Sequence, residues 1–92
     1  MDDNHANIHN DLGIMMQLQG KIDSAIVHFR QAVKLRPDYA EAHNNLGVSL
    51  AIQNKIDEAI IHFREALRII PDSVKTQDNL NIALEKQKKN LP

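Results

Sequence analysis

The chain has 92 residues, enough for one small domain whose core lies near the lower size limit for independent folding. Its formal charge of −1, from 11 basic and 12 acidic residues, lacks the basic excess with which nucleic-acid binders neutralise phosphates. The chain has no cysteine, which excludes disulfides and thiolate zinc sites, and no apolar run approaches the roughly 20 residues that cross a bilayer. Its acidic, polar start is unlike a signal peptide. We therefore expect a cytoplasmic chain, or a soluble fragment of a larger protein, that binds neither nucleic acid nor membrane.

The sequence repeats itself with a period of 34 residues. Residues 40–73 align with residues 6–39 without a gap, and 17 of the 34 aligned positions are identical. A third, partial copy begins near residue 74. A fixed period of this length is typical of solenoids, in which each repeat buries its apolar face against its neighbours.

Apolar residues recur every three to four positions in two segments of each full repeat, which predicts two amphipathic helices per repeat. The turn between them contains Gly20 in the first repeat, because glycine enters the left-handed backbone region without strain. Asn54, the next most tolerant residue, stands there in the second repeat. The expected N-caps of the second helices are Asp23 and Asp57. These helices are expected to end before Pro37 and Pro71.

Small residues indicate where helices approach closely. We expect Gly13 and Gly47 to lie beside Ala25 and Ala59 of the second helices, so that two backbones can come together. The third copy has Asn81 at the glycine position, which suits a helix on which no partner helix folds back. The chain is therefore expected to end in a terminal capping helix.

This fifth helix is expected to begin after a cap at Asp72 or Ser73, with Asp38 as the corresponding cap of the third helix. Its inward face should comprise Leu80, Leu84 and either Ile82 or Ala83. The expected organisation is a frayed lead-in, two repeats, the capping helix and a tail, at residues 1–5, 6–39, 40–73, 74–89 and 90–92.

The repeats resemble those of the tetratricopeptide repeat (TPR) family from residue 6 to about residue 87. The matching residues are Leu12, Gly13, Gly20, Ala25, Phe29, Ala32 and Pro37, then Leu46, Gly47, Ala59, Phe63, Ala66 and Pro71. The family's tryptophan and tyrosine places hold His9, His43, Met16 and Leu50 instead. The resemblance implies an all-α fold, an α-α superhelix with two full helix-turn-helix repeats and a C-terminal capping helix.

In this family the first helix of each pair lines a concave groove that commonly holds a peptide or a partner helix. The resemblance therefore implies a protein-binding module without a chemistry of its own. The residues expected to line the groove are Asn7, Asn10, Asp11, Ile14, Glu41, Asn44, Asn45, Val48, Lys75, Asp78 and Asn79, with Gln17, Ile52 and Ile82 beside them.

Two binding modes of the family can be compared with these residues. Chaperone-binding TPR proteins hold a C-terminal carboxylate with Lys, Arg and Asn; here Asn45 and Lys75 match. Two of the basic places hold Asn10 and Asn79, which disfavours that mode. The TPR superhelix of the O-linked N-acetylglucosamine transferases is more similar, because an asparagine recurs along its groove and bonds peptide backbone.

The places that correspond to those recurring asparagines hold Asp11, Asn45 and Asn79. An amide both donates and accepts hydrogen bonds, which suits recognition of a backbone whatever its sequence. The alternative interpretation is that these asparagines are only solvated helix residues. The transferase activity belongs to a separate catalytic domain, which this chain does not contain.

Five histidines raise the question of a metal site. His5 and His9 have the spacing of two ligands on one helix face, but no third ligand is fixed nearby apart from Asp2 or Asp3. His28 and His62 occupy equivalent positions of the two repeats, so repetition explains them better than coordination. We expect neither a metal nor another cofactor. No nucleophile–base pair or glycine-rich phosphate loop stands out, so we do not expect an enzyme.

The favoured function is a protein–protein interaction module that binds a peptide or partner helix in the concave groove. The alternative is a structural or self-assembling unit, either a homo-oligomer or a fragment of a longer repeat array. Val27 and Ile61, toward the convex side, would mark a contact with another chain if they were exposed. Partial burial under neighbouring side chains is the favoured interpretation of these two residues.

Overall fold

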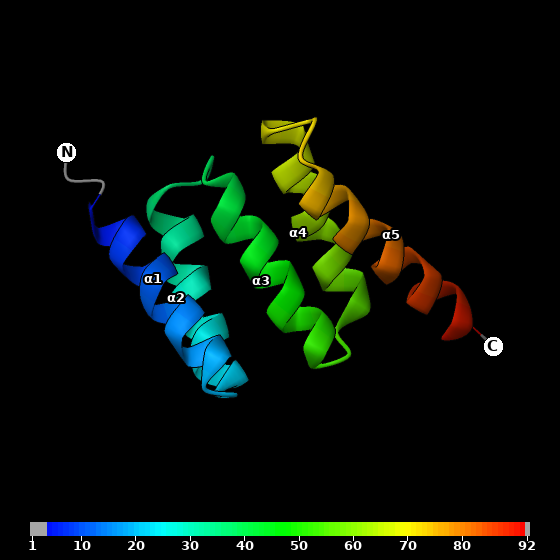
Figure 1. The fold of residues 1–92 in the computed structure, drawn as a ribbon, viewed down its shortest axis with the longest axis horizontal. Helices are drawn as coiled ribbons and strands as arrows, with labels where there is room; N and C mark the ends of the chain where they lie inside the picture. Colours follow the sequence, from blue (N-terminus) through cyan, green and yellow to red (C-terminus); the bar gives the residue numbers. More distant parts are fainter. Residues whose placement is uncertain (1–3, 92) are drawn as a thin grey trace.

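Five α-helices follow one another in residues 4–91, the part of the chain that this computed structural model describes (Figure 1). They are α1 (Asn4–Leu18), α2 (Ile22–Leu35), α3 (Ala40–Ile52), α4 (Ile56–Ile69) and α5 (Val74–Lys89). The expected all-α architecture of two helix pairs and a fifth, single helix is confirmed. α1 begins earlier than expected, at Asn4, and residues 1–3 of the expected lead-in lie outside the described part.

The turns inside the two helix pairs have the same left-handed geometry. Gly20 has a φ of 78° and Asn54 a φ of 63°, as the turn chemistry predicts. In both turns the backbone N–H of the following lysine donates, at 2.8 Å, to a carbonyl five residues earlier in the helix that is ending. This bond satisfies a carbonyl that the helix end would otherwise leave without a partner.

The starts of α2 and α4 differ from the expected N-caps. Both helices begin one residue before Asp23 and Asp57, which therefore lie in the first turn and do not cap it. Each aspartate instead accepts a hydrogen bond from a glutamine of the following repeat, from Gln53 and Gln87 respectively. The two aspartates thus join neighbouring repeats, and their charge still suits a helix N-terminus.

The other helix ends follow the sequence more closely. Ser73 caps α5, as expected, by accepting a hydrogen bond from the backbone N–H of Thr76 at 3.3 Å. α3 begins without a side-chain cap, so the cap expected from Asp38 is wrong. α2 and α4 end two residues before Pro37 and Pro71, because the residue before a proline is disfavoured in helical geometry.

The helices stack in a zigzag, each packing against the one before it, and the stack is curved. The backbones of α1 and α3, and those of α3 and α5, also approach one another, whereas those of α2 and α4 do not. Long side chains bridge that wider gap, in an ion pair of 2.8 Å between Arg30 and Glu58. α1, α3 and α5 therefore form the inner, concave face of the stack, and α2 and α4 form the outer face.

Two phenylalanines in equivalent positions form the centre of the core. Phe29 and Phe63 are buried in one cluster with isoleucines of α2 and α4 and leucines of α3 and α5. A Cβ placed on Gly13 would lie 2.5 Å from Cε1 of Phe29, and one on Gly47 would lie 2.6 Å from Cε1 of Phe63. A phenylalanine ring of the same repeat therefore makes the closest approach at each glycine, and the expected proximity of Ala25 and Ala59 stays a prediction.

α5 adds the last buried residues to the core of the described chain. Leu80 and Ala83 are buried, whereas Ile82 is exposed, so Ala83 is the inward residue of the two alternatives. Asn81 is exposed, and the capping role of this helix stays a prediction. Leu84 is half-buried beside the core.

Val27 and Ile61 lie on the outer helices α2 and α4. Their side chains are 59% and 63% exposed, so the favoured interpretation of partial burial is wrong. Each repeat therefore presents one large apolar side chain to solvent at the same outer position.

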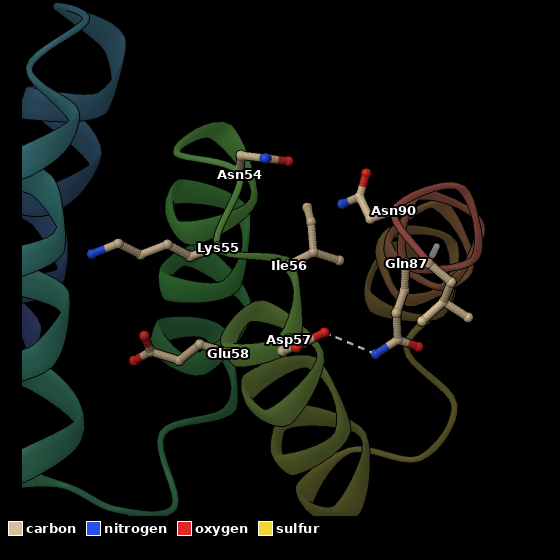
Figure 2. A pocket seen from close by; sticks show the side chains of 8 residues that line it. Asn54, Lys55, Ile56, Asp57, Glu58, Gln87 and Asn90 are labelled. Atoms are coloured by element: carbon tan, nitrogen blue, oxygen red, sulfur yellow. Dashed lines mark hydrogen bonds between the residues drawn. The ribbon is translucent and has the colours of Figure 1, made fainter.

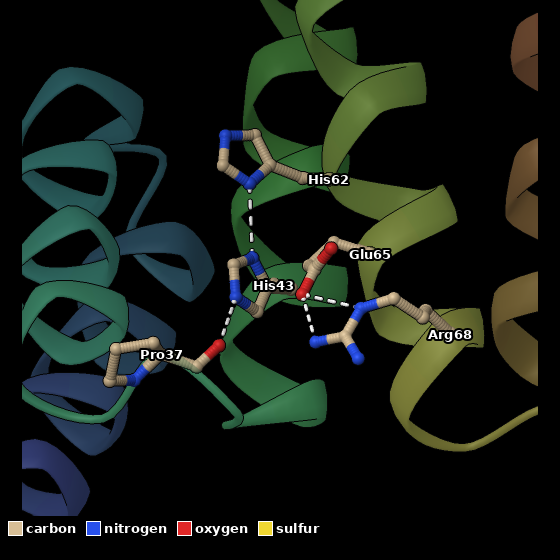
Figure 3. A network of polar contacts seen from close by, with 5 residues as sticks. All are labelled: Pro37, His43, His62, Glu65 and Arg68. Atoms are coloured by element: carbon tan, nitrogen blue, oxygen red, sulfur yellow. Dashed lines mark hydrogen bonds and ion pairs between the residues drawn. The ribbon is translucent and has the colours of Figure 1, made fainter.

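In each of the two full repeats, one pair of histidines joins the two helices. The Nδ1 atoms of His9 and His28 are 3.1 Å apart, as are those of His43 and His62, and the rings of each pair are stacked. Figure 3 shows the pair of His43 and His62. One ring must donate and the other accept, because two nitrogens that both carry hydrogen would repel. Repeated histidines thus hold helix to helix.

The pair in the second repeat has a defined proton arrangement. Nε2 of His43 lies 2.9 Å from the carbonyl oxygen of Pro37 (Figure 3). A carbonyl can only accept, so this nitrogen carries a hydrogen. In the neutral ring Nδ1 of His43 is then the acceptor, and Nδ1–H of His62 is the donor.

The surroundings of His62 disfavour its charged form. Burial lowers its pKa most, the facing His43 lowers it further, and Arg30 acts in the same direction. Glu58 and Glu65 oppose this shift, but Glu58 is paired with Arg30 and Glu65 with Arg68. The net result is a pKa below the ordinary value of 6.5.

Lowering the pH is therefore expected to destabilise the fold. Below pH 6.5 the unfolded chain binds a proton at His62 that the folded chain resists, so the stability that this group contributes is complete above that pH. This stability is lost as the pH falls toward the lowered pKa. Urea unfolding at pH 7.5, 6 and 5 measures the loss. His62→Gln should remove the part of the loss that occurs above the pH range in which carboxylates titrate. An equal loss in the variant would contradict the assignment.

Gly47→Ala is expected to destabilise the chain by about 1–2 kcal/mol, because the added methyl group meets the buried Phe63 ring and this exceeds the gain in helix propensity. Chemical denaturation measures the change. The matched control is the same substitution in a Phe63→Leu background, where the smaller side chain leaves room for the methyl group. Equal costs in both backgrounds would show that the ring is not the cause.

Candidate protein-binding groove

The residues expected to line the groove differ widely in exposure. The exposed ones are Asn7, Asp11, Glu41, Lys75 and Asp78; the half-buried ones are Ile14, Asn45, Val48 and Asn79; the buried ones are Asn10 and Asn44. All come from α1, α3 and α5, the helices of the concave face. Asn7 also accepts a long hydrogen bond, 3.5 Å, from Arg36 at the end of α2.

The asparagines form pairs between neighbouring repeats. Nδ2 of Asn45 donates to Oδ1 of Asn10 at 3.1 Å, which joins α3 to α1. Nδ2 of Asn79 donates to Oδ1 of Asn44 at 3.1 Å, which joins α5 to α3. Neither asparagine of such a pair is merely a solvated helix residue.

These pairs divide the asparagines by role. Asn10 and Asn44 are buried, so their carbonyl oxygens serve the contact between helices. Asn45 and Asn79 are half-buried and use one amide hydrogen in these bonds. Their second amide hydrogen and their carbonyl oxygen are not used in these two bonds. Asp11, the third position of this row, is exposed.

A row of apolar residues runs beside the asparagines, toward the C-terminal halves of the same helices. Its members stand at equivalent positions of the repeats and are Ile14, Val48 and Ile82, then Leu18 and Ile52. Ile52 and Ile82 are each 58% exposed, and Leu18 is exposed as well. The concave face thus has a polar row and an apolar row side by side.

Leu18 and Lys86 were not among the residues expected to line the groove. Leu18 stands one period before Ile52, and Lys86 one period after it. The 34-residue period, applied to Ile52, would have found them.

A pocket of about 180 Å³ opens in the apolar row between α3 and α5. Val48, Ala51, Ile52, Phe63, Asn79, Ile82, Ala83 and Lys86 line it. A second pocket of about 180 Å³ lies nearer the starts of these helices and includes Glu41 and Lys75. The concave face therefore has two pockets between α3 and α5, one in the apolar row and one nearer the starts of the helices.

A larger hollow of about 350 Å³ lies where the turn before α4 meets the end of α5 (Figure 2). Its charged residues Lys55 and Glu58 point away from α5, and Asp57 already accepts a hydrogen bond from Gln87 at 3.0 Å. The hollow is outside the two rows of the concave face. We therefore assign it no binding role.

Within residues 4–91, no three histidine, aspartate or glutamate side chains are grouped so that they could hold a metal ion. His5 and His9 accordingly have no third ligand in that part of the chain. None of the described helices is long and apolar enough to cross a membrane.

Asn79→Ala is expected to cost about 1–3 kcal/mol of stability, because it leaves the buried Oδ1 of Asn44 without its partner. Asn81→Ala is the matched control on the same helix. Asn81 is exposed and bonds only the exposed Gln77 among its described neighbours, so its loss should change stability by less than about 0.5 kcal/mol. Urea denaturation compares the two variants, and equal costs would contradict the structural role of the pair.

The profile of the tetratricopeptide repeat family matches residues 19–74, which are 56 of the 92 residues. No curated protein matches the chain. Two crystal structures of the MamA protein are similar, each with a TM-score of 0.88 and 23% identity over 95% of this chain. The chain spans about half their length, 48% and 51%, and at this identity the likeness shows the fold alone. The finer similarity to the O-linked N-acetylglucosamine transferases stays a prediction, whereas the chain belongs to the tetratricopeptide repeat family.

Proposed function

We propose that the chain is a protein–protein interaction module that holds a peptide or a partner helix in its concave groove. TPR repeats generally mediate protein interaction or assembly, which supports the broader part of the proposal. The observation that carries the finer part is the exposed apolar row beside the asparagine row on α1, α3 and α5. A partner segment with one apolar and one polar side would satisfy both rows.

In this proposal the asparagine row contacts the backbone of the partner. Asn45 and Asn79 each retain one amide hydrogen and the carbonyl oxygen beyond their bond to the neighbouring helix. This set can accept from a peptide N–H and donate to a peptide carbonyl. Such contacts are independent of the partner's side chains, so the apolar row would supply the selectivity.

A structural or self-assembling unit is the second candidate, and a separate observation favours it. Val27 and Ile61 are exposed at equivalent positions on the outer helices. Exposed apolar residues that recur on one face are typical of a surface that another chain covers. The partner would then be a second copy of this chain or adjoining repeats of a longer one.

The two candidates are distinguished by substitutions at matched positions. Ile82 in the groove and Ile61 on the outer face are the same residue type and are 58% and 63% exposed. A charge at either position should therefore perturb the fold equally little. We expect Ile82→Asp to abolish capture of the partner proteins that the wild-type chain retains from a lysate of its source cell, and Ile61→Asp to leave that capture unchanged.

The readout is quantitative mass spectrometry of the captured proteins, with circular dichroism to check that both variants are folded. Sedimentation at two concentrations of the purified chain accompanies it. The reverse pattern, with capture or self-association lost only in Ile61→Asp, would contradict groove binding and support the second candidate.

A further inference from the structure

We infer that the pocket between α3 and α5 takes one large aliphatic side chain of a partner segment that carries an acidic residue within about four positions of it. This inference rests on the proposed function and specifies the partner's chemistry. It follows from the lining of the pocket, from its size, from the charge at its edge, and from a comparison with the equivalent place between α1 and α3.

The pocket has apolar walls and a closed floor. Ile52 and Ile82 stand at its sides and are exposed, whereas Phe63 and Ala83 are buried beneath them. Asn79 supplies the one amide of the lining. A polar side chain entering here would lose its water without gaining enough partners, so an apolar side chain is favoured.

The size of the pocket limits what can enter. Pockets for drug-sized ligands have volumes of roughly 300–1,000 Å³. The pocket holds about 180 Å³ and is open to solvent on the groove side. It therefore suits a single side chain such as that of leucine, isoleucine or methionine, presented by a larger partner that lies along the groove.

One charge stands at the edge of this pocket. Lys86 is the single charged residue of the lining, and Lys89 follows it on the same helix face. Neither forms an ion pair within residues 4–91, whereas the neighbouring Lys88 pairs with Glu85 at 3.7 Å. The stem of Lys86 can cover the apolar wall while its ammonium group attracts a carboxylate. The partner residue next to the aliphatic side chain is therefore acidic.

The equivalent place between α1 and α3 is bridged by two polar side chains. Gln17 stands one period before Ala51, and Ser49 one period before Ala83. Nε2 of Gln17 donates to Oγ of Ser49 at 2.9 Å, so these side chains bridge the two helices at that level. Between α3 and α5 two alanines replace them, and the pocket is left open. The bridge between Gln17 and Ser49 thus has no counterpart at the two alanines of the second interface.

The test is a selection of random 12-residue peptides, displayed without free C-termini, on the 92-residue chain. Enriched peptides should share a large aliphatic residue with Asp or Glu within four positions. Enriched peptides without this pair would overturn the inference and leave groove binding intact. If no peptide is enriched, or if binding survives Ile82→Asp, the groove proposal fails together with it.

Two variants then assign the two halves of the motif. Ala51→Gln with Ala83→Ser transfers the bridge of the first interface into the second, and should weaken a selected peptide at least about tenfold by excluding its aliphatic side chain. Lys86→Glu should weaken it by about two- to fivefold, as for an exposed ion pair, and a peptide with Lys in place of the acid should bind this variant better than wild type. Unchanged affinity in either folded variant would overturn the corresponding half.

Discussion

The packing of one phenylalanine ring against one glycine sets the geometry of each helix pair. Phe29 lies against Gly13 and Phe63 against Gly47, so close that only a hydrogen fits on the glycine. The ring thus fills the space between the two helices of its pair. Both rings belong to one buried cluster that also includes Leu46 and Leu50 of α3 and Leu80 of α5, so the same core runs through the pairs and joins them. On this continuous core α1, α3 and α5 lie on one side of the stack.

Polar side chains then hold one repeat to the next with the same period. Asparagine pairs join α1 to α3 and α3 to α5 on the concave side, and aspartate–glutamine bonds join the repeats at the starts of α2 and α4. Histidine pairs act inside each repeat. Because every such bond recurs, the two interfaces are similar in backbone geometry. Their differences lie at positions where the repeats depart from each other in sequence.

The sequence predicted the features of the fold that depend on the preferences of single residues and on the apolar period. The positive φ at Gly20 and Asn54, the cap at Ser73 and the number of helices follow from residue preferences and the apolar period. It did not predict which residues touch. A period of 34 shows that Asn10 and Asn44 are equivalent, but the bonds run from Asn10 to Asn45, across a spacing of 35 that depends on the tilt between repeats. Asp23 and Asp57, expected as caps, instead accept hydrogen bonds from glutamines of the following repeat, and the period does not show these contacts either.

One of the places where the repeats differ on the concave face lies at the pocket between α3 and α5. Gln17 and Ser49 bridge α1 and α3, whereas the alanines at the corresponding positions leave space between α3 and α5. Filling that space would require only side chains that the first interface already accommodates. The fold therefore does not demand the opening, since the same helices pack in the same way around the bridge. A departure from the repeat that the fold does not need, on an exposed face and beside an unpaired lysine, points to a role in selecting the partner.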